Sequence, residues 1–513
     1  MIPESTLLYF ALALHLVSLV AFVFGKTKLS LALLFIGSFS LFLWGASLDH
    51  FLNDWDEHFH ALVGKNFIHH LLVPTLIDKP VLPYDKTSWY ENHIWLHKQP
   101  LFLWQIALSI SIFGVNELAV RLPSVLLSSI MVLMAYRMGA LIFNRRVGYI
   151  SALLTSTAHY IIMLVSGMGI DHNDISFMFY VTASIWAWIE YEQDLKLRWI
   201  LIMGIFSGAA VLCKWVAGLL VFAIFGYSHI FIKRDFFSKK IWIAFASSIL
   251  ICALIAIPWQ IYIQINFPIE AAFERKYSSR HFTEVIEEHH EVLWYYFNIL
   301  KNQYQMLQAF IFIGMGITLI RTRKLFITVP LMIGIALVYT FFTIAATKMF
   351  NYVLMIMPVM FVFMAAGFDL LIEFIRAHLS KWNFSIFFVV AIVILTYQNL
   401  GLKEILNEHS RGTDHAGIRW KAKNNNKNSF LNAAHSLPED YVIIWCSNPY
   451  ESIDCMFYSG HTAYGNVTED LVREMEQNHI KLAVFKQSNL PEFILRDSLI
   501  CKMPYRLNYV SPW

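Results

Sequence analysis

Long runs of apolar residues separated by short polar segments fill most of this chain. About twelve of these runs are long enough, or nearly so, to cross the hydrocarbon core of a bilayer as a helix of about 20 residues. They are 6–24, 29–48, 118–142, 147–166, 175–191, 197–212, 215–232, 241–263, 306–321, 325–346, 350–373 and 384–402. The continuous run 197–232 is too long for one crossing and is divided at Lys214. The first run is expected to be a retained span because no basic segment precedes it. The pattern predicts an all-α polytopic membrane domain over 1–402.

The pattern changes to that of a soluble domain over 403–513. Two short apolar runs there predict buried strands, and an amphipathic run between them predicts a helix with Thr468 as its N-cap. The strands are expected at 441–446 and 480–485, and the helix at 470–478. The asparagine-rich stretch 424–428 is expected to be a loop before the first strand. Together these elements predict a small α/β domain.

Basic residues recur in every second loop between the predicted spans, and such loops face the cytoplasm. They are Lys26 and Lys28, Arg145 and Arg146, Lys196 and Arg198, those of 233–240, those of 321–324, and Arg376 and Lys381. The other polar segments are therefore expected on the periplasmic side of an inner membrane. These include a first loop 49–117, a second loop 264–305 and the domain 403–513. Within the first loop, 101–113 is expected to be a juxtamembrane helix.

Composition agrees with this class of protein. Hydrophobic residues make up 57% of the chain and charged residues 15%, whereas soluble domains average about a quarter charged residues. The net charge of +3, without a basic stripe, argues against nucleic-acid binding. The five cysteines have neither CxxC nor zinc-site spacing. Cys446 and Cys455 could form a disulfide in an oxidising compartment or remain free thiols.

Acidic residues gather at two places beside the predicted spans. Asp54, Asp56 and Glu57 follow the second span, and Asp171 and Asp174 precede the fifth. A carboxylate at the membrane face can act as a general base on a hydroxyl, and two acidic groups could hold a divalent cation. The alternatives are ordinary: hydrated loop acids for the first group, and a helix N-cap for Asp174.

Cationic side chains lie on the same predicted side of the membrane. They are Lys98, Lys214, Arg275, Arg280, His281 and Lys348. A cation near the bilayer surface can pair with a lipid phosphate. Lys348 and Tyr352 are four residues apart, so on a helix they would share one face. Each residue alone could be surface charge or a snorkelling anchor. Taken together, two clusters of carboxylates and several cations on one predicted side of the membrane nevertheless suit transfer from a lipid-phosphate donor.

Three motifs in the first 130 residues resemble those of the GT-C glycosyltransferases that use polyprenyl-phosphate sugars. That group includes the lipid A aminoarabinose transferase and the protein O-mannosyltransferases. Asp56-Glu57-x-x-His60-Ala61 resembles the family's Asp-Glu-x-x-Tyr-Ala, with His60 in place of Tyr. His97-Lys98-Gln99-Pro100-Leu101-x-x-Trp104 resembles Lys-Pro-Pro-Leu-x-x-Trp, and Arg121-Leu122-Pro123-Ser124 resembles Arg-Leu-Pro-Ser.

Later motifs extend the resemblance over roughly 29–375. Asp174 before Phe179-Tyr180 resembles the family's Asp before a Phe-Phe pair. Lys214-Trp215 is similar to the Lys-Gly that starts a later span, and Lys348-x-x-x-Tyr352 resembles Lys-x-x-x-Tyr. The resemblance implies a GT-C-like fold and transfer of a sugar to a lipid, glycan or protein acceptor. No metal is required on this account.

We therefore expect a glycosyltransferase that inverts the anomeric carbon. Asp56 is the first candidate for the base, with Glu57 and Asp174 as the other catalytic candidates. Tyr352 and the cations would hold the donor phosphate. The cations are Lys98, Lys214, Arg275, Arg280, His281 and Lys348. One alternative is a transporter or flippase of lipid-linked substrates, which would place these charges along a path across the membrane. Another is a non-catalytic subunit that binds polyprenyl lipids.

Overall fold

The computed structural model describes residues 4–54, 56–166, 172–321, 324–446 and 449–509. They form two compact units. The first comprises Met1–Gly45, Ser124–Val165 and Asn173–Leu402, and the second comprises Ala46–Pro123, Ser166–His172 and Lys403–Trp513. The segment after the second span therefore belongs to the same unit as the C-terminal segment, although some 280 residues separate them in the chain.

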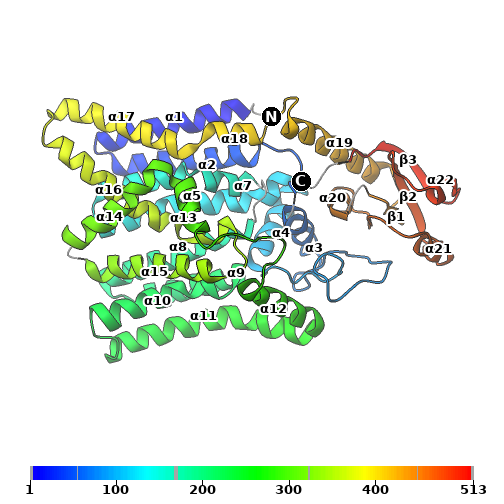
Figure 1. Cartoon of the computed structure of the whole chain (residues 1–513), viewed down its shortest axis with the longest axis horizontal. Coiled ribbons are helices and arrows are strands. Elements are labelled where there is room, and N and C mark those ends of the chain that lie inside the picture. Colours follow the sequence, from blue (N-terminus) through cyan, green and yellow to red (C-terminus); the bar gives the residue numbers. More distant parts are fainter. Residues whose placement is uncertain (1–3, 55, 167–171, 322–323, 447–448, 510–513) are drawn as a thin grey trace. The chain divides into compact units, whose positions relative to one another are not determined.

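The first unit is a bundle of helices (Figure 1). In chain order its helices are α1 (Glu4–Val23), α2 (Thr27–Ala46), α5 (Glu117–Ile142), α6 (Arg145–Ser156), α7 (His159–Ser166), α8 (His172–Asp194), α9 (Leu197–Lys214), η1 (Trp215–Leu219), α10 (Leu220–Tyr227), η2 (Ser228–Ile232), α11 (Lys239–Asn266), α12 (Pro268–Thr283), α13 (Tyr295–Tyr304), η3 (Gln305–Leu307), α14 (Gln308–Arg321), α15 (Leu325–Ile344), η4 (Phe350–Ile356), α16 (Met357–Arg376) and α17 (Lys381–Leu400).

By length and composition, 10 helices of the described chain can cross a membrane. They are Ser5–Val23, Thr27–Ala46, Glu117–Ile142, Arg145–Ser166, Leu197–Lys214, Lys239–Asn266, Tyr295–Arg321, Leu325–Ile344, Phe350–Arg376 and Asn383–Glu408. The other two predicted spans are also helical: 175–191 lies inside α8, and Val216–Ile232 is a shorter apolar segment. The polytopic α-helical class is confirmed. The predicted division at Lys214 is also confirmed, because α9 ends there and a 3-10 turn follows.

Glycines let two of these helices approach closely. A Cβ added at Gly314 of α14 would lie 1.8 Å from the carbonyl oxygen of Phe363 in α16. A Cβ at Gly367 of α16 would lie 2.1 Å from the carbonyl oxygen of Phe310. Small residues at such crossings allow backbone-to-backbone packing, which matters in a membrane because lipid tails are as apolar as the side chains.

The second unit contains the remaining helices and a three-stranded sheet. Its elements are α3 (Asp56–Asn66), α4 (Leu101–Phe113), α18 (Leu402–Glu408), α19 (His415–Ser436), β1 (Tyr441–Ile444), α20 (Pro449–Ser459), α21 (Glu469–Gln477), β2 (Lys481–Lys486), α22 (Glu492–Arg496) and β3 (Cys501–Arg506). The sheet order is β1-β2-β3 and both pairs are parallel, with Tyr441 opposite Lys481 and Ala483 opposite Cys501.

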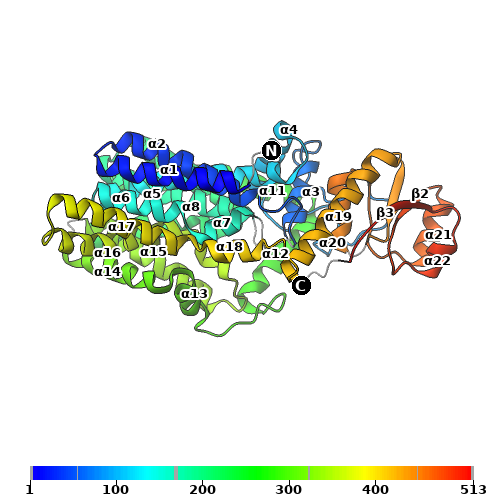
Figure 2. The ribbon, with the colours of Figure 1, turned by 90° about the horizontal axis from the view of Figure 1, so that it is seen from above.

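The sheet separates two apolar layers because successive residues of a strand point to opposite faces. Val442 and Ile444 belong to a cluster with residues of α21 and α22. Ile443, between them, belongs to a cluster with residues of α19 and α20. Figure 2 shows α21 and α22 beside the strands. The predicted strands and the predicted helix are confirmed, and Thr468 accepts a hydrogen bond from the backbone N–H of Leu471, as a cap should.

The prediction of a loop at 424–428 is wrong, because this stretch lies inside α19. The helix starts at an Asp414 cap, whose side chain accepts from the N–H of Gly417. Buried Asn426 makes two hydrogen bonds to the backbone of Asn508. Its side-chain amide donates to the carbonyl of Asn508 (2.9 Å) and accepts from the N–H of Asn508 (2.7 Å). These tertiary hydrogen bonds offset the low helix propensity of asparagine. That propensity costs only about a few tenths of a kcal/mol per residue relative to alanine.

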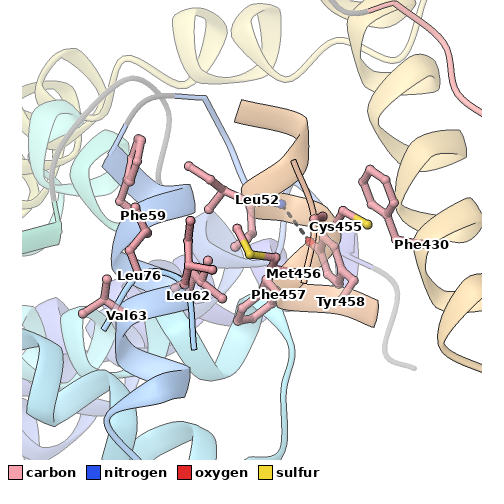
Figure 3. Close-up of a cluster of buried hydrophobic side chains, with 14 of the residues drawn as sticks. Leu52, Phe59, Leu62, Val63, Leu76, Phe430, Cys455, Met456, Phe457 and Tyr458 are labelled. Atoms are coloured by element: carbon pink, nitrogen blue, oxygen red, sulfur yellow. Dashed lines mark hydrogen bonds between the residues drawn. The ribbon is translucent and has the colours of Figure 1, made fainter. Parts of the chain in front are cut away.

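The first loop and the C-terminal segment share one apolar core (Figure 3). Phe59 and Leu62 of α3 pack in the same cluster as Met456 of α20 and Phe430 of α19. At its edge, the N–H of Leu52 donates to the Tyr458 hydroxyl at 3.0 Å. Burial of each large apolar side chain contributes about 1.5–3 kcal/mol. The C-terminal segment and the loop containing Asp56 therefore fold as one body.

Candidate active site

Asp56 and Lys98 form an ion pair in the second unit. Asp56 is the first residue of α3, and Lys98 lies three residues before Leu101, the first residue of α4. The Lys98 Nζ is 2.8 Å from the Asp56 carboxylate, and the two side chains are 17% and 18% exposed. The start of a helix favours a carboxylate. The pair is thus held in place but remains within reach of a ligand.

Glu57, the next residue, is in a different environment. Its carboxylate accepts from Arg121 Nε at 2.8 Å and Nη2 at 2.9 Å, and both side chains are fully buried. The remaining guanidinium N–H groups donate to carbonyls of the loop before α3. These are Ala46 (2.9 Å), Asp49 (2.6 Å) and Phe51 (2.7 Å). Arg121 therefore fixes the loop between α2 and α3 through backbone and carboxylate together.

Two further groups complete the shell around Glu57. The N–H of Asn53 donates to it at 2.6 Å, and His172 Nε2 lies 2.9 Å from it. Burial alone would raise the pKa of Glu57, but the charge of Arg121 and the hydrogen bonds from Arg121 and His172 outweigh burial and hold this pKa well below its usual value. Glu57 is thus a buried, fully bonded carboxylate, which favours a structural role over contact with an acceptor.

His60, which stands where the resemblance has tyrosine, is buried among rings. Its ring centroid is 4.7 Å from that of Phe102, 5.8 Å from that of Trp95 and 6.1 Å from that of His172. It therefore packs α3 against α4 and against His172, which belongs to the same unit.

Asp174 forms the centre of a second group, in the first unit. It is ion-paired with Lys214 at the end of α9, and the Asn351 amide donates to its other oxygen at 2.5 Å. The Lys214 Nζ also lies 5.3 Å from the ring centroid of Tyr352. Asp174 is in the first turn of α8, but these partners give it more than a capping role. Asp171, from the same sequence cluster, lies outside the described residues.

Lys348 does not share a helix face with Tyr352. The 3-10 helix η4 begins only at Phe350, so Lys348 precedes it in an extended segment, and the prediction from their spacing is wrong. Lys348 is buried, and its Nζ donates to the carbonyl of Ala345 at 2.7 Å, beyond the end of α15. It closes the turn between α15 and η4.

The other predicted cations lie on α12. Arg275 and Arg280 are exposed, and Arg280 pairs with Glu284 at 2.7 Å. His281 is half-buried, with Nδ1 at 3.2 Å from the carbonyl of Tyr277. Among the described residues, no contact joins either arginine to Asp174 or Lys214. Among the described residues, the structure therefore brings Lys214 to Asp174 and Tyr352 to Lys214, but it does not bring Arg275 or Arg280 to them.

Sequence reasoning gave no site role to Arg121 or His172, and it left Asp54 as an ordinary loop acid. The prediction for Asp54 is wrong: it pairs with Arg419 at 2.5 Å and with buried Lys423 at 2.9 Å. Arg121 lies near the start of a predicted apolar span, where an unpaired charge is costly. That position was a signal in the sequence that Arg121 has a buried partner. Nothing in the local sequence indicated the partners of Asp54.

Within the described chain, no group of three His, Cys, Asp or Glu side chains is placed to hold a metal ion. All five cysteines are free thiols, and only Cys501 is exposed.

Comparison with known proteins finds similarity over part of the chain. Residues 97–262 match the family model of dolichyl-phosphate-mannose-protein mannosyltransferases. A protein from Aquifex aeolicus is 30% identical over 135 residues, and this match spans about a quarter of each chain (26%).

Two solved structures share the fold over most of the chain. ArnT from Cupriavidus metallidurans, bound to undecaprenyl phosphate, is 13% identical, with a TM-score of 0.63 over 87% of this chain and 88% of ArnT. The oligosaccharyltransferase AglB from Archaeoglobus fulgidus, in complex with an inhibitory peptide and a dolichol-phosphate, is 13% identical. Its TM-score is 0.57 over 86% of this chain and 65% of AglB. The predicted GT-C-like fold is confirmed. The matched family model lies within the range 29–375 over which the motifs predicted the resemblance.

Proposed function

We propose that this protein transfers a sugar from a polyprenyl-phosphate donor to a hydroxyl of a periplasmic acceptor, with inversion at the anomeric carbon. The acceptor class is a lipid, a glycan or a protein. The observation that carries the proposal is the Asp56–Lys98 pair, in which a partly exposed carboxylate and a cation lie 2.8 Å apart at a helix start. Two structures with this fold hold undecaprenyl phosphate or dolichol-phosphate, which supports the donor class.

Asp56 acts as the base. Its carboxylate takes the proton of the acceptor hydroxyl as that oxygen attacks the anomeric carbon. The bond from the anomeric carbon to the phosphate oxygen breaks, and the polyprenyl phosphate leaves with the electron pair. A phosphate leaving group develops negative charge, so fixed cations near it lower the barrier more than a general acid would.

Lys98 and Lys214 supply that charge. Each is already paired with a carboxylate, Lys98 with Asp56 and Lys214 with Asp174. These carboxylates orient the lysines before the donor arrives, which reduces reorganisation during the reaction. Tyr352, next to Lys214, contacts the phosphate or sugar. Arg275, Arg280 and His281 stay predicted contacts of the donor, whereas Lys348 holds the turn that leads into η4. Glu57 positions Asp56 rather than reacting.

The test compares Asp56→Asn with wild type in purified, lipid-reconstituted protein supplied with polyprenyl-phosphate sugars. A positioned base contributes about 10²- to 10⁴-fold, so we expect a loss of turnover in that range with donor binding retained. The matched control is Asp78→Asn, an exposed acid of the same loop, which should leave turnover unchanged. Near wild-type turnover of Asp56→Asn would remove it from the base role. Movement of donor across the bilayer without transfer would instead indicate a flippase.

A further inference from the structure

Asp54 and His58 flank Asp56 by two residues on either side, and both are held by the C-terminal segment. Asp54 pairs with Arg419 at 2.5 Å and with Lys423 at 2.9 Å, both on α19. His58 is fully buried, is hydrogen-bonded to Asp454 of α20, and lies 3.6 Å from Asp54. The start of α3 is therefore bound by charged groups from two helices more than 350 residues further along the chain.

Lys423 lies at the centre of this network. Its Nζ is 2.9 Å from Asp54, 3.5 Å from Asp454 and 3.6 Å from Glu451, and its side chain is 3% exposed. A buried ammonium is costly unless several partners compensate its charge. Three carboxylates do so here, and each therefore has a defined position relative to the others.

The apolar core continues this hold along α3 (Figure 3). Leu62 and Val63 pack in the cluster that contains Met456 and Phe457 of α20. Lys65, one turn further on, donates to the carbonyls of Met456 (2.9 Å) and Phe457 (2.8 Å). Contacts to α20 thus follow α3 from its first turn to its last.

Helix geometry determines what this hold does to Asp56. Successive residues of an α-helix are about 100° apart, so residues two apart point in nearly opposite directions. His58 points to the network, and Asp56 points away from it, toward Lys98. Fixing one side of α3 therefore sets the direction of the carboxylate on the other side.

We propose that Lys423, Asp454 and Arg419 of the C-terminal segment are positioning residues that orient Asp56 toward Lys98. The C-terminal segment is then part of the catalytic machinery, in addition to any contact it makes with the acceptor. This inference rests on the proposed function, because it assumes that the direction of Asp56 matters for turnover.

The experiment uses the full chain and compares Lys423→Met with Lys421→Met, an exposed lysine of the same helix. Turnover, the KM for a polyprenyl-phosphate sugar and hydrogen exchange of 54–66 are measured on each. A misplacement of about 1 Å can cost about 100-fold in rate. We expect Lys423→Met to lower kcat about 10- to 100-fold, with KM within about twofold and faster exchange in α3. Lys421→Met should match wild type.

Arg419→Gln keeps the test decisive if Lys423→Met does not fold, because the Arg419 side chain is partly exposed (19%) and its loss is milder. A lower kcat with unchanged melting temperature supports positioning, as does recovery of kcat in Arg419→Lys. If kcat per folded molecule is unchanged in Arg419→Gln and only its melting temperature falls, the positioning role is overturned. Active Asp56→Asn with faster α3 exchange in Lys423→Met would reject the base role while retaining the mechanical link.

Discussion

Replacement of Arg121 by methionine should destabilise the second unit more than any other single change near Asp56. Arg121 is fully buried and makes five hydrogen bonds, two to Glu57 and three to the carbonyls of Ala46, Asp49 and Phe51. Methionine has an unbranched side chain, shorter than that of arginine, and no donor. It would leave one buried carboxylate without its counter-charge and three carbonyls without a partner from this side chain.

The magnitude follows from those losses. Breaking a buried ion pair by removing one partner costs about 3–5 kcal/mol. Each unsatisfied buried acceptor adds about 1–3 kcal/mol, less where water enters. The sum exceeds about 5 kcal/mol, a large part of the 5–15 kcal/mol that keeps a domain folded. The effects are not additive, because one side chain carries all of them.

A double-mutant cycle with Glu57 separates the charge from the carbonyls. Glu57→Gln removes the charge that Arg121→Met leaves unpaired, so the double variant should be more stable than Arg121→Met alone. Thermal unfolding of the detergent-solubilised full chain measures the three variants. A melting temperature of Arg121→Met within about one degree of wild type would refute the reasoning. A double variant less stable than the sum of both singles would refute the assigned pairing.

Two further predictions concern pH and topology. Burial alone lowers the pKa of His58, and the charge of Lys423 lowers it further. The charge of Asp454 and the hydrogen bonds to Asp454 and Asp54 together outweigh both and raise this pKa to about 9. The stabilisation is thus complete below about pH 6.5, the unfolded value, and is lost as pH rises through 9. Thermal unfolding between pH 6.5 and 9.5 should show this decline in wild type but not in His58→Gln, and equal slopes would contradict it. Cys501 is the one exposed cysteine of the described chain, so a membrane-impermeant maleimide should label intact cells from the periplasmic side. Cys501→Ser is the control, and labelling only after the cytoplasm is opened would reverse the proposed orientation.

Much of the fold was available from local pattern. Apolar runs predicted the helices because a bilayer leaves the backbone no partner outside its own helix. The division at Lys214 and the cap at Thr468 were also local, since each depends on a few neighbouring residues. The loop predicted at 424–428 failed because bonds to Asn508, 82 residues away, decide the conformation there.

The sequence by itself determined which residue types are present: Asp56 beside Glu57, with lysines in the later polar segments. It did not determine what separates the two acids. That depends on Arg121, which lies 64 residues from Glu57 in the chain and pairs with it in the interior. Asp56, one residue before Glu57, pairs with Lys98. Nor did it show that Asp54 and His58 are held from α19 and α20. Neighbours on a helix point about 100° apart, so only the tertiary structure decides which one is buried and which one can meet a substrate.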